Sequence, residues 1–143
     1  MWHNRAILGE TRFALNGNLA ELPRLSAEIA RFCQEQSLDT DVAFDLNLAL
    51  EELFTNAVQH GGCEGMSNAV VIRLERARDG VRVEFSDRGV AFDPASAPPP
   101  DLESPLEQRN AGGLGIHLVR KIMSDLHYWR ADDWNRITMR KPI

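Results

Sequence analysis

One long apolar stripe dominates the sequence, between Asp41 and His60. Its members recur every three or four residues, which places them on one side of a helix. They are Leu46, Leu50, Leu53, Phe54 and Ala57. Two glycines, Gly61 and Gly62, follow the stripe and are typical of a helix end. The pattern therefore predicts an amphipathic helix over residues 41–60.

A second helix is predicted upstream, over residues 19–36, from apolar residues at the same spacing. Residues 10–15 alternate polar and apolar side chains and predict a short strand. The same alternation over residues 69–77 and 81–86 predicts two more strands. Between these two strands Asp79-Gly80 carries the signal of a tight hairpin turn.

The last third of the chain begins with a loop and then returns to regular structure. Residues 87–109 have no periodicity and contain five prolines. A glycine-rich stretch opens a helical pattern over residues 112–126. Residues 127–140 read as two strands around Asp132-Asp133, with Asn135 as a further candidate for the turn.

A chain of 143 residues fits one domain, so residues 1–143 are expected to form a single unit. The element order is strand, helix, helix, two strands, loop, helix and two strands. Helices that share one face of a sheet give an α+β two-layer sandwich. We expect the sheet to be mostly antiparallel and mixed.

Composition excludes several classes of function. The formal net charge of -5 argues against binding nucleic acid through phosphate neutralisation. No apolar run is long enough to cross a membrane, and Cys33 and Cys63 lack metal-ligand spacing. A cytoplasmic protein is expected. Late basic residues, Arg136 and Arg140 among them, fit a solvated surface better than a site for an acidic partner.

Three segments carry polar residues that packing alone does not require, and the first is in the 41–60 helix. Glu52 and Asn56 are four residues apart and share a face. Asparagine is a poor helix-interior residue, and its amide oxygen suits Mg²⁺ beside substrate phosphates. Glu52 could act as a general base. Taken alone, the pair fits a solvated helix face better than a functional site.

The second segment is Asp87-Arg88-Gly89 at a strand end. A carboxylate followed by glycine lets the backbone turn sharply while the acid accepts a hydrogen bond from a ligand amine, such as that of adenine. An ordinary strand-to-loop turn also uses aspartate and glycine. By itself this signal is weak.

The third segment, Gly112-Gly113-Leu114-Gly115, opens a helix. Free backbone NH groups and the helix dipole at such a start favour an anion, and glycines let phosphate oxygens approach closely. It matches neither the Walker A pattern nor the dinucleotide fingerprint. A flexible linker end remains an alternative.

In combination, the order of the three segments resembles the nucleotide site of the gyrase, heat-shock chaperone, histidine kinase and mismatch-repair ATPase superfamily. The chain is most similar to its compact branch, the bacterial anti-sigma-factor serine kinases. Three stretches carry the resemblance, within a span of about residues 10–141. They are residues 50–61, residues 87–94 with Asp87-Arg88-Gly89, and residues 113–123.

The resemblance implies ATP and Mg²⁺ as cofactors and assigns a role to each matched residue. Glu52 matches the catalytic glutamate, Asn56 the asparagine that holds Mg²⁺, and Asp87 the aspartate that reads adenine. Gly89 completes the turn after that aspartate. The remaining matches are Gly113, Leu114 and Gly115 on the phosphate side, Thr138 as a support of the adenine pocket, and residues 94–112 as the lid. Ala91 departs from the pattern, since many relatives have a second glycine there.

By the same resemblance, the protein phosphorylates a serine of a small antagonist protein and also binds a sigma factor. A homodimer through residues 10–36 is a further expectation. The main alternative is a non-catalytic ATP-binding regulator that docks a phosphatase or a sensor kinase. The detached catalytic half of a histidine kinase and a scaffold with a degenerate pocket are the others.

Overall fold

The computed structural model describes residues 6–91 and 111–143, and for residues 111–115 the backbone alone. Five strands form one sheet in the order β1-β2-β3-β5-β4. They are β1 (Gly9–Leu15), β2 (Val70–Ala77), β3 (Gly80–Asp87), β4 (Ser124–Ala131) and β5 (Trp134–Pro142). The helices are α1 (Leu22–Glu35), α2 (Thr40–Gln59) and α3 (Ala111–Ile122), and the short 3-10 helix η2 (Leu19–Glu21) precedes α1.

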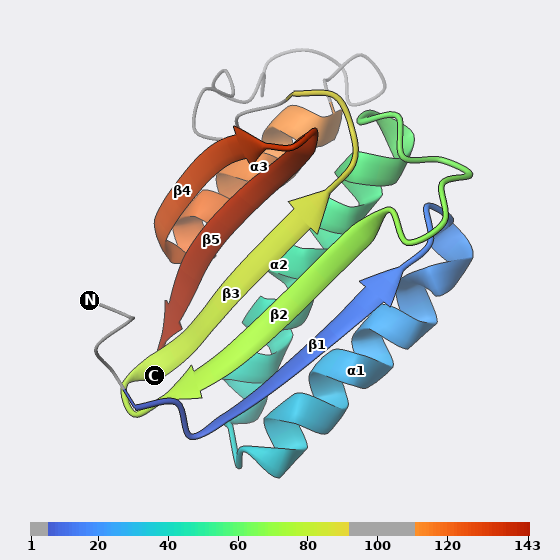
Figure 1. Cartoon of the computed structure of the whole chain (residues 1–143). Helices are drawn as coiled ribbons and strands as arrows, with labels where there is room; N and C mark the ends of the chain where they lie inside the picture. The colour runs from blue at the N-terminus through green and yellow to red at the C-terminus, as the bar shows by residue number, and fades with distance from the viewer. Residues whose placement is uncertain (1–5, 92–110) are drawn as a thin grey trace.

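All three α-helices of the described residues lie on one face of the sheet, and none of them covers the other face (Figure 1). The α+β two-layer sandwich is therefore confirmed. The antiparallel part of the sheet prediction is confirmed as well, because every pairing among the described strands is antiparallel. The expectation of a mixed sheet is wrong for these strands, since none of the pairings among them is parallel.

The hydrophobic core fills the space between the sheet and the helices. The apolar stripe of α2 faces it, and its members Leu46, Leu50 and Phe54 are fully buried. From the sheet, alternate residues of the central strands point the same way, such as Ile72 and Phe85. A helix with one apolar face and strands with one apolar face can bury both only against each other, which explains the two layers.

Two tight hairpins connect neighbouring strands as predicted. Ala77 pairs with Gly80 across the first turn. At the second, β4 and β5 are joined by Asp132 and Asp133, whose φ angles of 54° and 64° are left-handed. Aspartate tolerates this conformation better than most residues, and two such residues in sequence give the turn that matches the twist of the strands.

Two sequence-based boundaries are wrong. Asn135 is not part of the turn but lies within β5, directly opposite Asp87 of β3. The helix predicted to reach Leu126 ends at Ile122, and β4 begins at Ser124. Asp125 has a φ of 54°, which a right-handed helix cannot accommodate, and Leu126 suits the apolar pattern of either structure.

The two faces of the sheet differ in chemistry because side chains alternate along each strand. The helix-covered face is apolar, whereas the uncovered face carries rows of charged side chains from Glu10, Arg73, Glu75, Arg82 and Glu84. Two ion pairs cross between strands, Arg73 with Glu10 at 3.0 Å and Arg82 with Glu75 at 2.9 Å. The same arginines also pair within their own strands, with Glu75 at 3.2 Å and Glu84 at 3.7 Å.

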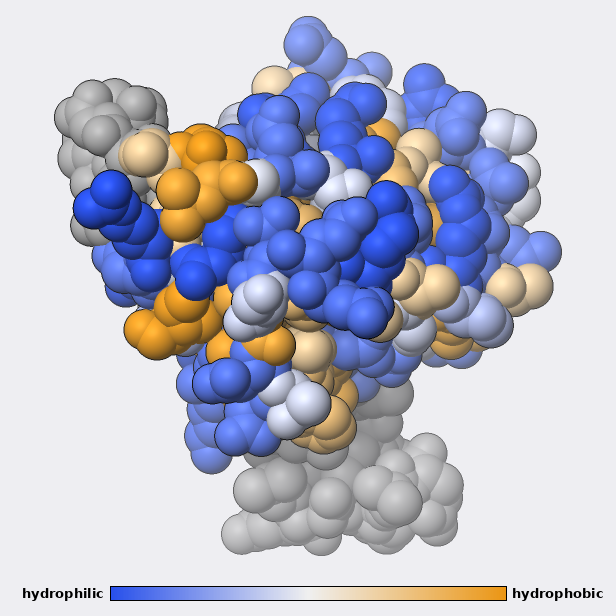
Figure 2. Space-filling view, turned by 90° about the horizontal axis from the view of Figure 1, so that it is seen from below, coloured by the Kyte–Doolittle hydropathy of each residue, from blue (hydrophilic) through white to orange (hydrophobic). Residues whose placement is uncertain are grey.

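At the end of the molecule that holds the β2–β3 hairpin, charged residues surround smaller hydrophobic patches (Figure 2). Backbone hydrogen bonds attach two exposed apolar residues to this hairpin, from Leu8 N to Arg76 O at 2.7 Å and from Ile143 N to Asp79 O at 3.1 Å. Among the helices that the structure describes, none has the length and apolar character needed to span a membrane.

Candidate functional site

The turn after β3 centres on the side chain of Asp87, which is 8% exposed. One carboxylate oxygen, Oδ1, accepts hydrogen bonds from the backbone NH of Gly89 at 2.8 Å and from Nδ2 of Asn135 at 2.9 Å. For the other oxygen, Oδ2, no hydrogen bond is found within the described residues. The described residues thus occupy one oxygen and leave the other available as a hydrogen-bond acceptor.

Burial raises the pKa of Asp87, because a charged carboxylate loses hydration in this position. Three groups act in the opposite direction by stabilising the charged form. They are the side chain of Asn135, the backbone NH of Gly89 and, at longer range, the Arg130 guanidinium. A buried acid surrounded by donors that favour its charge is the arrangement expected of a ligand-reading group rather than of a solvated turn.

Gly89 is required by the close approach of another backbone segment. A Cβ at this position would lie 2.4 Å from the carbonyl oxygen of Gly61, which is too close for any side chain. The same oxygen accepts a hydrogen bond from Val90 N at 2.8 Å, and Gly61 N donates to Asn56 O at 2.9 Å. These contacts fasten the Asp87 turn to the end of α2. The carbonyl oxygen of Gly89 accepts a hydrogen bond from Arg130 at 2.9 Å.

Asn135 completes the turn from the neighbouring strand and is 3% exposed. Its Nδ2 donates to Asp87 Oδ1 and also to the carbonyl oxygen of Val90 at 2.7 Å. Its Oδ1 accepts from the Tyr128 hydroxyl at 2.6 Å and from Arg130 Nη1 at 3.0 Å. Both ends of the amide are therefore occupied, and Asn135 fixes the orientation of the Asp87 carboxylate.

The predicted role of Thr138 in this pocket is wrong. Thr138 pairs with Glu84 of β3 and His127 of β4, on the face of the sheet that carries no helix. Residues an odd number apart on a strand point to opposite sides of the sheet, and Asn135 is three residues from Thr138. Asn135 and its pairing partner Asp87 therefore point to the helix-covered face. The sequence signal for Asn135 is its spacing of two and four residues from the buried Ile137 and Met139, which places all three on one face of the strand.

On α2 the structure places Glu52 and Asn56 one turn apart, both partly exposed. Nδ2 of Asn56 is buried and has no hydrogen-bond partner within the described residues. A buried amide group without a partner costs about 1–3 kcal/mol. Rotation of the amide exchanges its nitrogen and oxygen, so the buried position can also hold the amide oxygen.

Glu52 is half-buried, and its pKa is raised by burial first and by the negative charge of Glu51 second. Glu51 is held by Ser26 Oγ at 3.1 Å and Asn47 Nδ2 at 2.8 Å. For Glu52 no hydrogen bond is found among the described residues. A carboxylate with a raised pKa and no protein partner is a better proton acceptor than a solvated one.

The predicted glycine-rich helix start agrees with the position of α3, which begins at Ala111. Gly113 lies in the first turn, where backbone NH groups have no partner within the helix, and Leu114 and Gly115 follow it. α3 packs against α2, the helix that carries Glu52 and Asn56. Residues 92–110, most of the predicted lid, lie outside the described residues.

No group of three or more His, Cys, Asp or Glu side chains in the described ranges could hold a metal ion. A metal held entirely by such side chains is therefore not found in this part of the chain. With its oxygen turned to the position of Nδ2, Asn56 would fit a different arrangement, in which Mg²⁺ takes one protein oxygen and several oxygens of phosphates and water.

Cys63 contacts the same turn, with its sulfur 4.0 Å from Asp87 Oδ1. Burial, with a smaller contribution from the Asp87 charge, raises the pKa of this thiol to about 11. The thiol is therefore protonated at neutral pH and acts as a weak donor and a packing group. Cys33 is buried too, and both cysteines are free.

The family model described as histidine kinase-like ATPase domain matches residues 15–141. This chain belongs to that family. The identification confirms the resemblance drawn from the three motifs. By that resemblance, the candidate elements for binding ATP are the Asp87 turn, the Asn56 face of α2 and the start of α3.

Curated relatives of this ATPase domain are named as protein kinases. The serine/threonine-protein kinase BtrW of Bordetella bronchiseptica is 35% identical over 96 residues, which is 67% of this chain and 68% of the relative. The serine-protein kinase RsbW of Oceanobacillus iheyensis is 31% identical over 57% of this chain and 54% of its own length. RsbW of Bacillus cereus strain G9842 is 29% identical over 69% of this chain and 63% of its own length.

A solved structure supports the fold of the domain. The crystal structure of the RsbU and RsbW domains of Rv1364c from Mycobacterium tuberculosis matches with a TM-score of 0.68. The match covers 94% of this chain and 32% of that chain at 17% sequence identity. At this identity the likeness concerns the fold alone.

Proposed function

We propose that this chain is an ATP-dependent protein kinase that transfers the γ-phosphoryl group of ATP to a serine of a small antagonist protein. One observation carries the proposal: a buried Asp87 with one free acceptor oxygen is fastened through Gly61 to the helix that presents Asn56 and Glu52. The names of the relatives support a kinase that acts on serine or threonine.

The adenine end of the nucleotide is assigned to Asp87. Its Oδ1 is held by Gly89 and Asn135, so Oδ2 can accept a hydrogen bond from the exocyclic amine. A base that offers a carbonyl at this position would face a carboxylate without a donor, which is unfavourable for a buried group. The site should therefore prefer adenine to guanine.

The phosphate end is assigned to Asn56 and to the first turn of α3. Asn56 would hold Mg²⁺, which neutralises charge on the phosphates when it is bound. Backbone NH groups of the first turn of α3, which includes Gly113, would bind phosphate oxygens, and Leu114 and Gly115 lie directly after them.

Glu52 is assigned the role of general base. It accepts the proton of the substrate serine hydroxyl while the serine oxygen forms a bond to the γ-phosphorus. The bond between that phosphorus and the β–γ bridging oxygen breaks, and ADP leaves with the electron pair. The raised pKa of Glu52 favours this proton transfer.

The partners follow from the same proposal. A small antagonist protein supplies the phosphoacceptor serine, and a sigma factor is the second partner, bound in the alternative state. We also propose a homodimer through residues 10–36 and a cytoplasmic location. A non-catalytic ATP-binding regulator is the competing proposal, because it needs Asp87 and Asn56 but not Glu52.

The deciding experiment combines ATP binding with phosphotransfer. ATP affinity is measured by calorimetry with and without Mg²⁺, and the protein is then incubated with γ-labelled ATP and an antagonist protein encoded beside it. Label on an antagonist serine is the expected result. Tight ATP binding without label would reject the kinase and favour the regulator, and absence of binding would reject both.

A further inference from the structure

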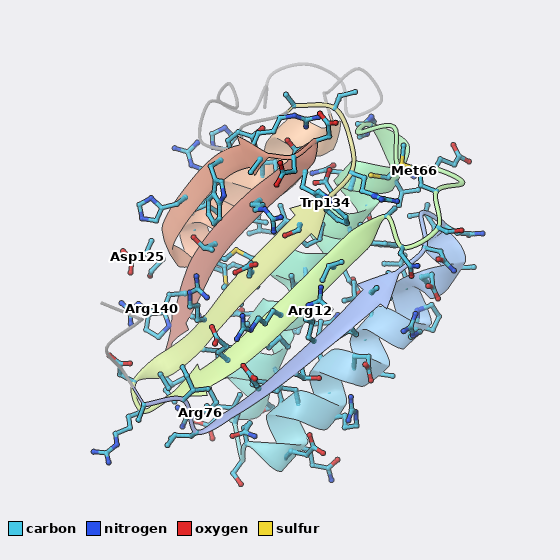
Figure 3. All side chains as sticks on the ribbon, viewed as in Figure 1. Arg12, Met66, Arg76, Asp125, Trp134 and Arg140 are labelled. Atoms are coloured by element: carbon cyan, nitrogen blue, oxygen red, sulfur yellow. The ribbon has the colours of Figure 1, made fainter. Side chains whose placement is uncertain are left out.

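A hollow of about 270 Å³ lies on the face of the sheet that carries no helix, away from Asp87. Its lining comes from four strands. The lining residues are Arg12, Val71, Arg73, Glu84, Ser86, Trp134 and Arg136. Figure 3 shows Arg12 and Trp134 on this face of the sheet, contributed by β1 and β5.

Strand register explains why the surface is hollowed at this point. Val71 of β2, Ser86 of β3 and Arg136 of β5 follow one another across the sheet in one row of paired residues. The first two have short side chains, so they form a floor, and Ser86 is only 4% exposed. The neighbouring row, with Arg12 opposite Arg73, has long side chains and forms a wall.

The charges around this floor are unbalanced. Arg12 and Arg73 are directly opposite on paired strands, an arrangement of like charges that is unfavourable in a sheet. Arg73 is compensated by Glu10 at 3.0 Å and Glu75 at 3.2 Å. For Arg12 and Arg136, no ion pair is found within the described residues. Glu84, the acidic residue of the lining, pairs with Arg82 at 3.7 Å. Among the described residues, Arg12 and Arg136 therefore remain as cations of the hollow without an ion pair, in a chain whose net charge is -5.

Trp134 gives the hollow an apolar side next to its cations. The guanidinium carbon of Arg88 lies over the indole ring, 5.1 Å from its centroid. This cation–π contact orders the tryptophan and adds positive charge at the edge of the hollow. Guanidinium groups bind carboxylates through paired hydrogen bonds, and a flat ring beside them accommodates the methylene groups of an acidic side chain.

The size of the hollow decides between classes of ligand. Pockets for cofactors and drug-sized molecules typically occupy about 300–1,000 Å³, and this hollow, at about 270 Å³, falls below that range. Its volume of about 270 Å³ suits one or two side chains. Because no buried cation lines the hollow, a single free anion would gain little by leaving water. A peptide segment that contacts several strands at once would add the binding energy of each contact.

We propose that this hollow is a docking site for an acidic segment of a partner protein, with a glutamate or aspartate carboxylate placed between Arg12 and Arg136. The two sides of β3 and β5 then have separate tasks. Asp87 and Asn135 face the helix-covered side, whereas their sequence neighbours Ser86 and Arg136 face the hollow. The proposal does not depend on phosphotransfer.

The test uses the full 143-residue chain and a fluorescein-labelled hexaglutamate peptide, with binding followed by fluorescence anisotropy at two salt concentrations. The wild type should bind the peptide and release it as salt rises. Arg12→Gln and Arg136→Gln should each weaken binding by about threefold to tenfold. Hexaglutamine carries the same backbone without charge and should not bind.

Arg140→Gln is the matched control. Arg140 lies on the same strand and face as Arg136 but four residues away, about 13 Å along the strand, and it pairs with Asp125 at 3.1 Å. Loss of this charge should change the affinity by less than about twofold, because the separation exceeds the Debye length at physiological salt. Circular dichroism melts confirm that all three variants are folded.

Three results would overturn the proposal. The first is no binding of hexaglutamate at low salt. The second is an equal loss of affinity in Arg140→Gln and Arg136→Gln, which would mean that only net charge matters. The third is inorganic phosphate that displaces the peptide at equal concentration, which would make the hollow a site for a small ion instead of a protein segment.

Discussion

The Asp87 turn and the Asn56 face of α2 are joined through Gly61, yet they differ in how completely the protein satisfies their polar groups. At the turn, Asn135 has partners for both ends of its amide and holds one oxygen of Asp87. On α2, Nδ2 of Asn56 is buried without a partner within the described residues.

This difference separates two ways of building a ligand site. A group that reads the shape and donors of a base has to be fixed beforehand, since its selectivity depends on orientation. A group that takes part in binding a cation, or in moving a proton, gains most if the protein leaves it unpaired until the ligand arrives. With the roles proposed above, the turn would follow the first way, and Asn56 and Glu52 would follow the second.

The largest expected effect is on phosphotransfer in Glu52→Gln. Loss of a general base lowers the rate by about 10² to 10⁴. ATP affinity should stay near that of the wild type, because Glu52 is assigned no contact with the nucleotide before transfer. Single-turnover transfer of label to the antagonist and calorimetric ATP binding measure the two quantities separately.

Glu51→Gln is the control for that experiment, since its amide oxygen can still accept from Ser26 and Asn47. Transfer should continue. The acid limb of the pH–rate profile should move to lower pH, because the Glu51 charge contributes to the raised pKa of Glu52. In the wild type the rate falls as pH decreases through that raised pKa. A rate loss in Glu51→Gln as large as in Glu52→Gln would contradict the assignment.

The next effect is on ATP affinity in Asp87→Asn. The amide oxygen of the new side chain can still accept from Gly89 and Asn135, but an NH2 group replaces the free oxygen and opposes the adenine amine. Affinity should fall by about 10- to 100-fold.

Stability moves differently in Asp87→Asn. The pKa of Asp87 is raised in the folded state, so the wild type loses stability as pH increases through that pKa, and the variant lacks this loss. The variant should therefore be at least as stable as the wild type at neutral pH, as measured by urea unfolding. A destabilised variant would mean that the carboxylate serves the fold.

A smaller effect is expected for Asn135→Ala, which removes one of the two hydrogen bonds to Asp87 Oδ1 and the bonds of Asn135 to Val90 and Tyr128. Unfolding free energy should fall by about 1–3 kcal/mol, with a parallel loss of ATP affinity. Thr138→Ala on the same strand is the control, since Thr138 points to the other face. Equal effects of the two substitutions on ATP affinity would place the pocket on the wrong side of the sheet.

The smallest expected change in unfolding free energy is a gain. Asn56→Ala removes a buried amide group that lacks a partner and introduces a better helix former, so unfolding free energy should rise by about 0.5–1 kcal/mol. Mg²⁺-dependent binding of ATP should be lost in the same variant. If stability instead decreases, Asn56 has a structural role, and the comparison between the two regions fails.

Much of this fold could be predicted because it depends on short-range patterns. The α2 stripe, the Asp79-Gly80 hairpin and the glycine-rich start of α3 are each set by residues within a few positions of one another. The boundary between α3 and β4 was wrong, since Leu126 fits a helix and a strand equally well and the left-handed Asp125 decides between them.

The sequence by itself determined the candidate residues Glu52, Asn56 and Asp87, because their spacing and order are local properties of the chain. Only the tertiary structure decided which residue of β5 faces Asp87. A shift of one residue moves a side chain to the other face of the sheet, so register selects Asn135 and excludes Thr138. Register also aligns Val71, Ser86 and Arg136 into the hollow on the uncovered face, since strands distant in sequence meet there.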